Sequence, residues 1–348
     1  MTMPRDIEVI APNLKRRLSG VTATIARLVP VQAREIGIVA TGPGLPADVP
    51  HLPLWRVATL PRDRWRVWHA RRNTEMLLGL VLRHVMRRRF RLMFTSASQR
   101  THTAYSRWLI HRMDAVVATS RRSADYLDVP ATVILHGIDT STFSPAADRL
   151  ALRARLGLPE GRLIGCYGRI REQKGTGDFV AAMLRLLPRH PGTTALVMGR
   201  ATEAHGGYLD ALKQRVELAG LASRILFLPE VSVDAMPDWY RVLDLYIAPQ
   251  RWEGFGLTPL ESMACGTPVV ATRVGAFDEL VDPGVTGVLV EPGDPASLAE
   301  AAAQLLFDAP ALDAMRDAAR RHVQTRFRIG QEAQALIAIY RRLLGEPS

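Results

Sequence analysis

The second half of the chain alternates short apolar runs with helix-like stretches, and this alternation constrains the fold more than any other feature of the sequence. Continuous apolar runs of this length are typical of strands buried on both faces of a parallel sheet. The strand-like runs cover residues 163–167, 195–198, 225–227, 245–247, 269–271 and 287–290. The alternation predicts an α/β fold with a doubly wound sheet, in which ligands bind beyond the carboxyl ends of the strands.

The first half predicts a second domain of the same class, with strand-like runs at 7–12, 115–120 and 131–135. A chain of 348 residues is too long for one ordinary core and suits two α/β domains. Residues 136–145 show neither a helical nor a strand period and end in proline. We therefore place the domains at 1–145 and 146–327, followed by a terminal helix at 328–348 that packs back on the first domain.

The net charge of +11 lies in the first half, where residues 1–145 contain 22 Lys and Arg against 10 Asp and Glu. The densest stretch, 62–91, combines arginines with Trp65, Trp68 and the apolar run 76–82. Arginine binds phosphates and tryptophan favours the headgroup level, so this stretch predicts contact with an anionic membrane or a phosphorylated glycolipid. A solvated helix face is the alternative. Nucleic acid is a rival partner that no recognised binding motif supports.

The sequence also predicts where the protein works. No run approaches the ~18 apolar residues that span a bilayer, and the first residues lack the apolar core of a signal peptide. We expect a cytoplasmic protein held peripherally at the inner face of the cytoplasmic membrane. Cys166 and Cys265 stand alone in apolar runs, which favours core packing. No Asp-x-Asp or ligand-spaced cluster occurs in the sequence, so neither a metal site nor a cofactor is predicted.

The chemistry of the chain concentrates in residues 251–268, which read RWEGFGLTPLESMACGTP. Two carboxylates, Glu253 and Glu261, lie around a glycine-rich turn that follows an apolar run. A strand, a glycine turn and a helix start form a site for an anion, because the first backbone N–H groups of a helix lack internal partners. Alternatively, Thr258 and Glu261 form a capping box and Glu253 is an exposed loop carboxylate.

A second loop, 168–175, follows the first strand of the second domain and carries Arg169 and Lys174. Cations are unfavourable near a helix N-terminus unless an anion joins them. The loop therefore predicts a bound anion rather than ordinary surface charge.

Together these motifs resemble the Glu-x7-Glu signature of the retaining GT-B glycosyltransferases, in which two Rossmann-like domains face each other across a cleft. The resemblance implies that Glu253 lies near the transferred sugar and that Glu261 holds the ribose hydroxyls of a nucleotide-sugar. It also implies that Arg169 and Lys174 clasp the diphosphate. Fixed cations there lower the barrier, because the leaving diphosphate gains negative charge as the glycosidic bond breaks.

The resemblance implies further substrate-binding positions in both domains. They are Gly254, Phe255, Gly256 and Leu257 at the turn, Gly199 and Leu228 near the base and sugar, and Ser19 and Gly20 near the diphosphate and acceptor. Many members of the family carry a catalytic histidine after a strand similar to residues 92–95. Here the chain continues to His102, which either takes that role or is an incidental loop residue.

Residues 11–22 and 94–100 are similar to the mannosyltransferases that build the lipopolysaccharide core of certain Gram-negative bacteria. That similarity implies GDP-mannose as the donor and 3-deoxy-octulosonate on a lipid A precursor as the anionic acceptor. The alternatives on this scaffold are a transferase for another nucleotide-hexose and a nucleotide-sugar epimerase. A non-catalytic protein that binds nucleic acid or membranes is an alternative of a different class.

Overall fold

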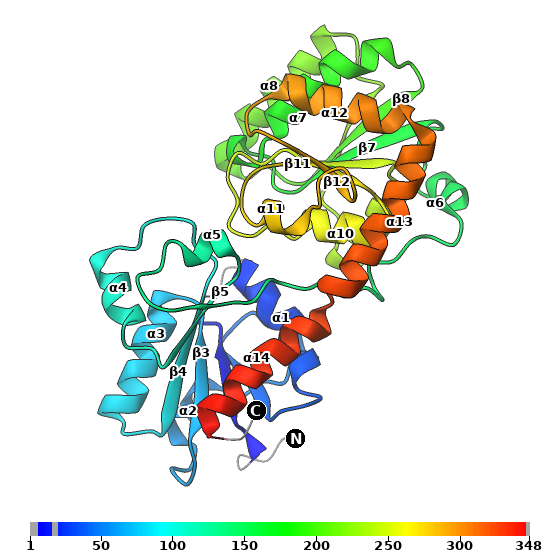
Figure 1. The fold of residues 1–348 in the computed structure, drawn as a ribbon. Helices are drawn as coiled ribbons and strands as arrows, with labels where there is room; N and C mark the ends of the chain where they lie inside the picture. Colours follow the sequence, from blue (N-terminus) through cyan, green and yellow to red (C-terminus); the bar gives the residue numbers. More distant parts are fainter. Residues whose placement is uncertain (1–5, 16–19, 346–348) are drawn as a thin grey trace. The chain divides into compact units, whose positions relative to one another are not determined.

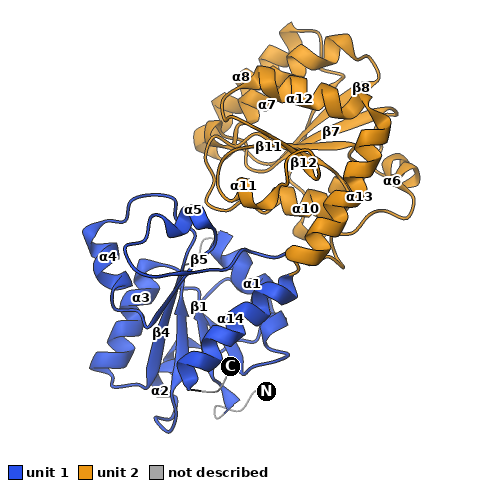
Figure 2. Cartoon of the chain, viewed as in Figure 1, with its two compact units in different colours: residues 1–137, 329–348 blue, residues 138–328 orange. Residues whose placement is uncertain are grey.

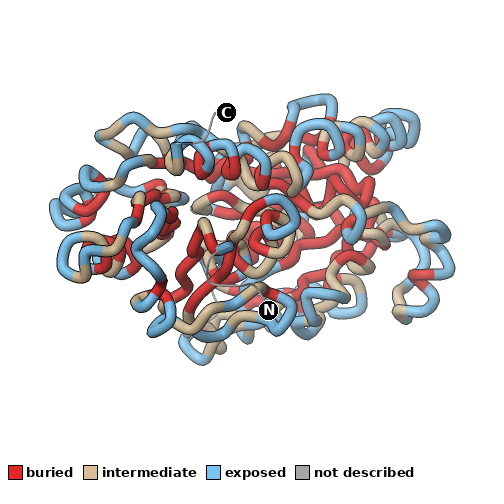
Figure 3. Tube along the Cα trace, turned by 90° about the horizontal axis from the view of Figure 1, so that it is seen from below, coloured by how far each residue is buried: buried red, intermediate tan, exposed pale blue. Residues whose placement is uncertain are grey.

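The computed structural model describes residues 6–15 and 20–345. The chain forms two compact units: unit 1 contains residues 1–137 and 329–348, and unit 2 contains residues 138–328 (Figure 2). Buried residues gather inside each unit, whereas exposed ones lie on the outer helices and loops (Figure 3). Within the described ranges, no helix is long and apolar enough to cross a membrane.

Unit 1 is built on a six-stranded parallel sheet in the order β2-β1-β3-β4-β5-β6 (Figure 1). The strands are β1 (Val9–Pro12), β2 (Ile38–Thr41), β3 (Arg66–Ala70), β4 (Phe90–Ser96), β5 (Ala115–Ala118) and β6 (Thr132–Val133). The helices are α1 (Gly20–Gln32), α2 (Leu54–Thr59), α3 (Asn73–Leu80), the π-helix η2 (Val81–Val85), α4 (Ala104–Ile110), α5 (Arg121–Ala124) and α14 (Ile329–Leu344).

Both faces of this sheet are covered, because successive residues of a strand point to opposite sides. Val9 and Ala11 of β1 pack into the core beneath α1 and α14, while Ile10 between them packs into the core beneath α3 and α4. This arrangement explains why the central strands are apolar along their whole length.

Unit 2 is built on a second six-stranded parallel sheet in the order β12-β11-β10-β7-β8-β9. The strands are β7 (Arg162–Tyr167), β8 (Thr193–Met198), β9 (Ile225–Leu228), β10 (Leu245–Ala248), β11 (Val269–Thr272) and β12 (Gly287–Val290). The prediction of an α/β chain with two Rossmann-like sheets is therefore confirmed.

Helices cover both faces of the second sheet as well: α7, α8 and α12 on one, and α10, α11 and α13 on the other (Figure 1). The α-helices are α6 (Arg149–Arg155), α7 (Thr176–Leu186), α8 (Gly206–Leu218), α9 (Met236–Arg241), α10 (Thr258–Ala264), α11 (Phe277–Leu280), α12 (Pro295–Phe307) and α13 (Ala309–Arg326). Short 3₁₀ turns are η3 (Glu172–Lys174), η4 (Leu187–Arg189), η5 (Glu203–His205) and η6 (Val233–Ala235).

The two units divide between Gly137 and Ile138, whereas the sequence pattern placed the boundary at residue 145. Hydrogen bonds explain the difference, since they tie residues 138–144 to unit 2. The Ile138 N–H donates to the Phe327 carbonyl (2.7 Å) and the Arg241 side chain donates to the Ser144 carbonyl (2.7 Å). The terminal helix α14 packs against α1 and belongs to unit 1.

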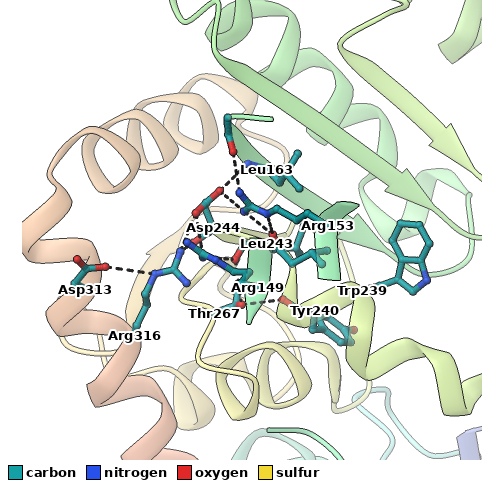
Figure 4. A network of polar contacts seen from close by, with 12 residues as sticks. Arg149, Arg153, Leu163, Trp239, Tyr240, Leu243, Asp244, Thr267, Asp313 and Arg316 are labelled. Carbon is teal, nitrogen blue, oxygen red and sulfur yellow. Dashed lines mark hydrogen bonds and ion pairs between the residues drawn. The ribbon is translucent and has the colours of Figure 1, made fainter. Parts of the chain in front are cut away.

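A buried ion-pair network holds the amino ends of β7 and β10 together (Figure 4). Asp244, next to β10, accepts hydrogen bonds from Arg153 of α6 (2.7 Å), Arg316 of α13 (3.1 Å) and the Leu163 N–H of β7 (2.8 Å). Arg149 lies 3.1 Å from the same carboxylate. Burial is the main cause that lowers the pKa of Arg316, to about 10, so the side chain stays charged at neutral pH.

We expect Asp244→Ala to destabilise unit 2 by about 3–5 kcal/mol, because it leaves buried guanidinium groups without their carboxylate. Asp313→Ala is the matched control: Asp313 lies 3.8 Å from the same Arg316, but its side chain is 80% exposed. An exposed pair contributes under about 1 kcal/mol. Urea unfolding of both variants measures the difference, and equal midpoints would contradict the structural role of Asp244.

Candidate active site

The candidate site lies where the strand order of unit 2 reverses. From β7 the chain continues to β8 and β9 on one side, whereas β10, β11 and β12 lie on the other side. The loops that follow β7 and β10 therefore leave the sheet at neighbouring carboxyl ends, which is where doubly wound sheets bind their ligands. These loops cover residues 168–175 and 249–257.

The two loops are fastened to each other by close backbone contacts. Gly175 has a φ of 71°, and a Cβ atom there would lie 1.7 Å from the Pro249 carbonyl oxygen, so only glycine fits. The Arg251 N–H donates to the Gln173 carbonyl (3.1 Å). Arg251 also binds both oxygens of the buried Asp178 at 2.7 Å, and these bonds raise the pKa of Arg251.

Lys174 and Glu253 meet across this junction. The Lys174 Nζ donates to Glu253 Oε2, and Glu253 Oε1 accepts from the Gly254 N–H (3.0 Å). Both side chains are largely buried, with 22% and 16% of their surface exposed. Arg169 lies on the same loop as Lys174 and is exposed. The structure thus brings a carboxylate and a cation together and places a second cation on the same loop.

Glu261 lies on α10 and contacts the aromatic core of unit 2. Its Oε2 accepts a hydrogen bond from the Tyr240 hydroxyl at 2.8 Å. Burial, reinforced by the charge of Glu261, raises the pKa of Tyr240, so the phenol stays protonated and donates. The capping-box alternative is wrong, because the N-cap of α10 is Leu257, with no side-chain cap hydrogen bond, and Thr258 is already helical.

The glycine-rich turn between these groups is held against α11. Phe255 is buried, and its carbonyl accepts from the Ala276 N–H at 3.1 Å. Gly256 lies beside the Phe277 ring, and Gly254 and Leu257 are half-buried. The turn therefore has a fixed path from β10 to the start of α10.

Gly199 directly follows β8, and Leu228 is the last residue of β9. The Gly199 N–H donates to the Leu228 carbonyl at 3.4 Å. Gly199 has a φ of 150°, and a Cβ atom there would lie 1.8 Å from the Gly168 carbonyl oxygen. Glycine is therefore required for the loops after β7 and β8 to approach each other.

The remaining predicted site residues belong to unit 1. Gly20 is exposed at the first position of α1, and Ser19 lies outside the described residues. His102 is half-buried in the loop between β4 and α4. Burial lowers the pKa of His102 against the opposing effect of Asp128, so its imidazole is neutral at neutral pH.

Several residues of the basic stretch 62–91 are buried, among them Trp68, Arg66, and Met76 and Leu82 of the apolar run, so the prediction that these residues contact a membrane is wrong. Trp68 is fully buried against Phe90 and donates to the Glu75 carbonyl at 2.8 Å. Arg66 is 2% exposed and donates to the Ile7 carbonyl at 2.9 Å. Both lie on β3, a central strand that helices cover on both faces. Trp65 is 39% exposed and lies outside the sheet.

Sequence reasoning missed the residues that support the site, above all Asp178 and Tyr240. The sequence signal for Asp178 was Arg251, two positions before Glu253, because an arginine next to the motif needs a carboxylate partner. Among the described residues, no group of three or more His, Cys, Asp or Glu side chains is arranged to hold a metal ion.

Two doubly wound parallel sheets, with charged loops at the strand reversal of the second, are the architecture of the GT-B glycosyltransferases. The fold resembles that of HepE from Anabaena, a structure solved in complex with UDP, with a TM-score of 0.83 over 96% of this chain and 99% of that one, at 21% identity. Residues 148–322 match the model of the glycosyl transferases group 1, and the chain belongs to this family.

Two relatives resemble the chain over nearly its whole length. It is 53% identical to the lipopolysaccharide core biosynthesis mannosyltransferase LpsB of Rhizobium meliloti, over 98% of this chain and 99% of that protein. It is 52% identical to the lipopolysaccharide core biosynthesis mannosyltransferase LpcC of Rhizobium leguminosarum, over 98% of both. The prediction of a GT-B glycosyltransferase similar to lipopolysaccharide core mannosyltransferases is confirmed, and the chain is a glycosyltransferase.

Proposed function

We propose that the protein transfers mannose from GDP-mannose to the 3-deoxy-octulosonate of a lipopolysaccharide core acceptor, with retention of configuration. The observation that carries the proposal is the contact of Lys174 with Glu253 at the strand reversal of unit 2. The near full-length similarity to LpsB and LpcC supports mannose as the sugar and the lipopolysaccharide core as the acceptor.

Arg169 and Lys174 are the groups that we assign to the diphosphate. A lysine ammonium has three donors, so Lys174 can keep its bond to Glu253 while it donates to a phosphate oxygen. During transfer the bond between the anomeric carbon and the diphosphate oxygen breaks, and the diphosphate takes the electron pair. Fixed cations beside that oxygen stabilise the growing charge by roughly 3 kcal/mol for each contact.

The acceptor hydroxyl attacks the same face of the sugar that the diphosphate leaves. Its oxygen bonds to the anomeric carbon, and its proton passes to an oxygen of the departing diphosphate. Glu253 lies beside Lys174 and accepts hydrogen bonds from the sugar hydroxyls. Gly254, Phe255, Gly256 and Leu257 present their backbone to the sugar and diphosphate.

Glu261 holds the ribose in this proposal. A carboxylate accepts about four hydrogen bonds, so the bond from Tyr240 orients Glu261 and leaves capacity for two hydroxyls. Gly199 and Leu228 border the position of the base. Ser19, Gly20 and His102 serve the acceptor side in unit 1, where the neutral imidazole of His102 can donate or accept one proton.

We also propose that unit 1 binds the inner face of the cytoplasmic membrane through a groove on α3, η2 and α4. The groove has a volume of about 610 Å³ and is lined by Leu80, Val81, Arg83, His84, Val85, Trp108, His111, Arg112, Met113 and Asp114. Val85 is 74% exposed and Trp108 is 45% exposed, and the Arg112 guanidinium lies 4.0 Å from the centre of the Trp108 ring. An exposed tryptophan beside arginine suits anionic headgroups.

A transfer assay tests the proposed reaction. We expect the purified protein to mannosylate the lipid acceptor from GDP-mannose and to give no product from UDP-glucose. Activity should persist in excess EDTA, because the sequence has no Asp-x-Asp and the cations Arg169 and Lys174 are available for the diphosphate. Mass spectrometry detects the product and NMR of the new linkage reports retention. Glucose transfer, inversion, or activity that returns only with Mg²⁺ or Mn²⁺ would contradict the corresponding part of the proposal.

Glu261→Ala should weaken GDP binding about tenfold to a hundredfold, because hydrogen bonds to a charged group contribute roughly 1.5–3 kcal/mol. Glu300→Ala, which removes an exposed glutamate from α12, is the control and should bind GDP like the wild type. Titration calorimetry measures both affinities. Unchanged binding by Glu261→Ala would show that the carboxylate only supports Tyr240.

Replacing the tryptophan and arginine of the groove should weaken membrane binding. We expect Trp108→Ser with Arg112→Gln to bind anionic vesicles at least about tenfold more weakly, since one arginine near the surface contributes ~1 kcal/mol and the ring adds buried apolar area. Wild-type binding should also fall as salt rises. Co-sedimentation with vesicles measures both effects.

A second tryptophan–arginine pair provides the matched control. Trp55 is 65% exposed, and Arg56 lies 5.2 Å from the centre of its ring on α2, outside the groove. Trp55→Ser with Arg56→Gln should bind vesicles like the wild type. Equal loss in both variants, or no binding by the wild type at low salt, would rule out the groove. Arg88 is unsuitable for such a test because it donates to the Leu60 carbonyl and supports a loop.

A further inference from the structure

Unit 1 contains a second cavity, of about 380 Å³, at the carboxyl ends of β3 and β4. Its polar lining includes Arg71, Arg72, Ser98, Arg100, Thr101 and His102. We name this cavity the arginine pocket. It lies at the edge of the sheet where a doubly wound domain binds ligands, and its volume is within the ~300–1,000 Å³ of small-molecule sites.

The arginine pocket is strongly cationic. Arg71 and Arg72 follow β3, and Arg100 comes from the loop after β4. The lining residues that the structure describes include no aspartate or glutamate. The nearby Glu75 pairs with Arg72 at 2.8 Å, and the charges of Glu75 and Glu332 both act on Arg71, so the charges of these two arginines are partly compensated. The pocket therefore has an excess of positive charge that favours an anionic ligand.

Two of the arginines are fixed in place before any ligand binds. The Arg72 guanidinium donates to Glu75 Oε1 (2.8 Å) and to Asn13 Oδ1 (2.9 Å), and the Glu75 side chain is fully buried. The Arg71 N–H donates to Glu75 Oε2 (2.8 Å), and its guanidinium donates to the His69 carbonyl (3.2 Å). Groups that are already ordered lose little entropy on binding, so they raise affinity.

The remaining lining residues supply neutral hydrogen-bonding groups. His102 Nε2 is buried and has no hydrogen-bond partner within the described part of the chain. An unpaired buried nitrogen is unfavourable, and a hydroxyl of a bound ligand could supply the missing hydrogen bond. Ser98 and Thr101 add hydroxyl groups to the same wall. Cationic forks beside neutral donors and acceptors match a sugar that carries both hydroxyls and an acidic group.

We propose that the arginine pocket binds the acidic sugar of the acceptor and selects acidic over neutral acceptors. The inference rests on the proposed function for the assumption that the acceptor is a glycan. The recognised group is a carboxylate or a phosphate on that sugar, since an arginine fork binds either of them with two parallel hydrogen bonds. Arg100 is the residue to test, because it is exposed, whereas Arg71 and Arg72 take part in the buried Glu75 cluster.

The experiment compares the acceptor KM of the wild type and of Arg100→Gln on three acceptors at saturating GDP-mannose. The acceptors are the intact glycolipid, its carboxyl methyl ester and its dephosphorylated form. We expect Arg100→Gln to raise KM for the intact acceptor about tenfold or more, with kcat nearly unchanged. For the acceptor that lacks the recognised group, the two proteins should have the same KM. If this acceptor is the methyl ester, the recognised group is the carboxylate. If it is the dephosphorylated form, the recognised group is the phosphate.

Arg34→Gln is the matched control, since it removes one exposed positive charge from unit 1 outside the pocket lining. It should leave KM unchanged. The inference is overturned if Arg100→Gln has the wild-type KM for the intact acceptor. It is also overturned if KM rises equally for all three acceptors, because Arg100 then does not contact the acidic group.

A binding measurement separates failure of this inference from failure of the proposed function. Saturation-transfer NMR of the wild type and Arg100→Gln with free 3-deoxy-octulosonate, its methyl ester and inorganic phosphate needs no donor and no turnover. Binding of the free acid or of phosphate that weakens in Arg100→Gln supports the pocket even if mannose transfer fails. If the protein binds GDP and transfers mannose, but Arg100→Gln binds the free acid and phosphate as the wild type does, the proposed function stands and the inference about the arginine pocket is overturned.

Discussion

The structure of unit 2 depends on the carboxylate of Asp244. It accepts a hydrogen bond from the Leu163 N–H of β7 and binds Arg153 of α6 and Arg316 of α13. Burial of any one of these three charged groups alone would be unfavourable, but here each charge is paired with an opposite charge. The network fixes β7 beside β10 at their amino ends, so the loops at their carboxyl ends emerge side by side. The position of the candidate active site follows from that pairing.

The carboxyl ends of the same strands are held by a second set of contacts. Gly175 approaches the Pro249 carbonyl, and Arg251 reaches from one loop to the buried Asp178 at the start of α7. These contacts leave little freedom for Lys174 and Glu253, which then meet between the loops. A site for a charged ligand benefits from this arrangement, because fixed charges need no reorganisation when the ligand binds.

The composition of unit 1 shows only an excess of basic residues, whereas its structure divides these residues into two groups at different places. One set of cations lies around an exposed tryptophan on α3, η2 and α4, where a surface can be reached. Another set, Arg71, Arg72 and Arg100, lines a cavity at the carboxyl ends of β3 and β4. Glu75 links the second set to the core, since it is fully buried and holds Arg72 at 2.8 Å.

The sequence by itself determined the second parallel sheet and the family, because apolar strand periods and the motif from Glu253 to Glu261 are local patterns. In the first half it indicated the class of the fold but missed the strands β2 and β3. It also indicated that Lys174 and Glu253 belong to one site, since both follow strands of the same sheet. Only the tertiary structure decided which basic and aromatic residues face solvent. Trp68 and Arg66 lie on a central strand that is covered on both faces, and no local pattern shows which strand is central. The arginine pocket joins loops that are far apart in the chain, and only packing brings such residues together.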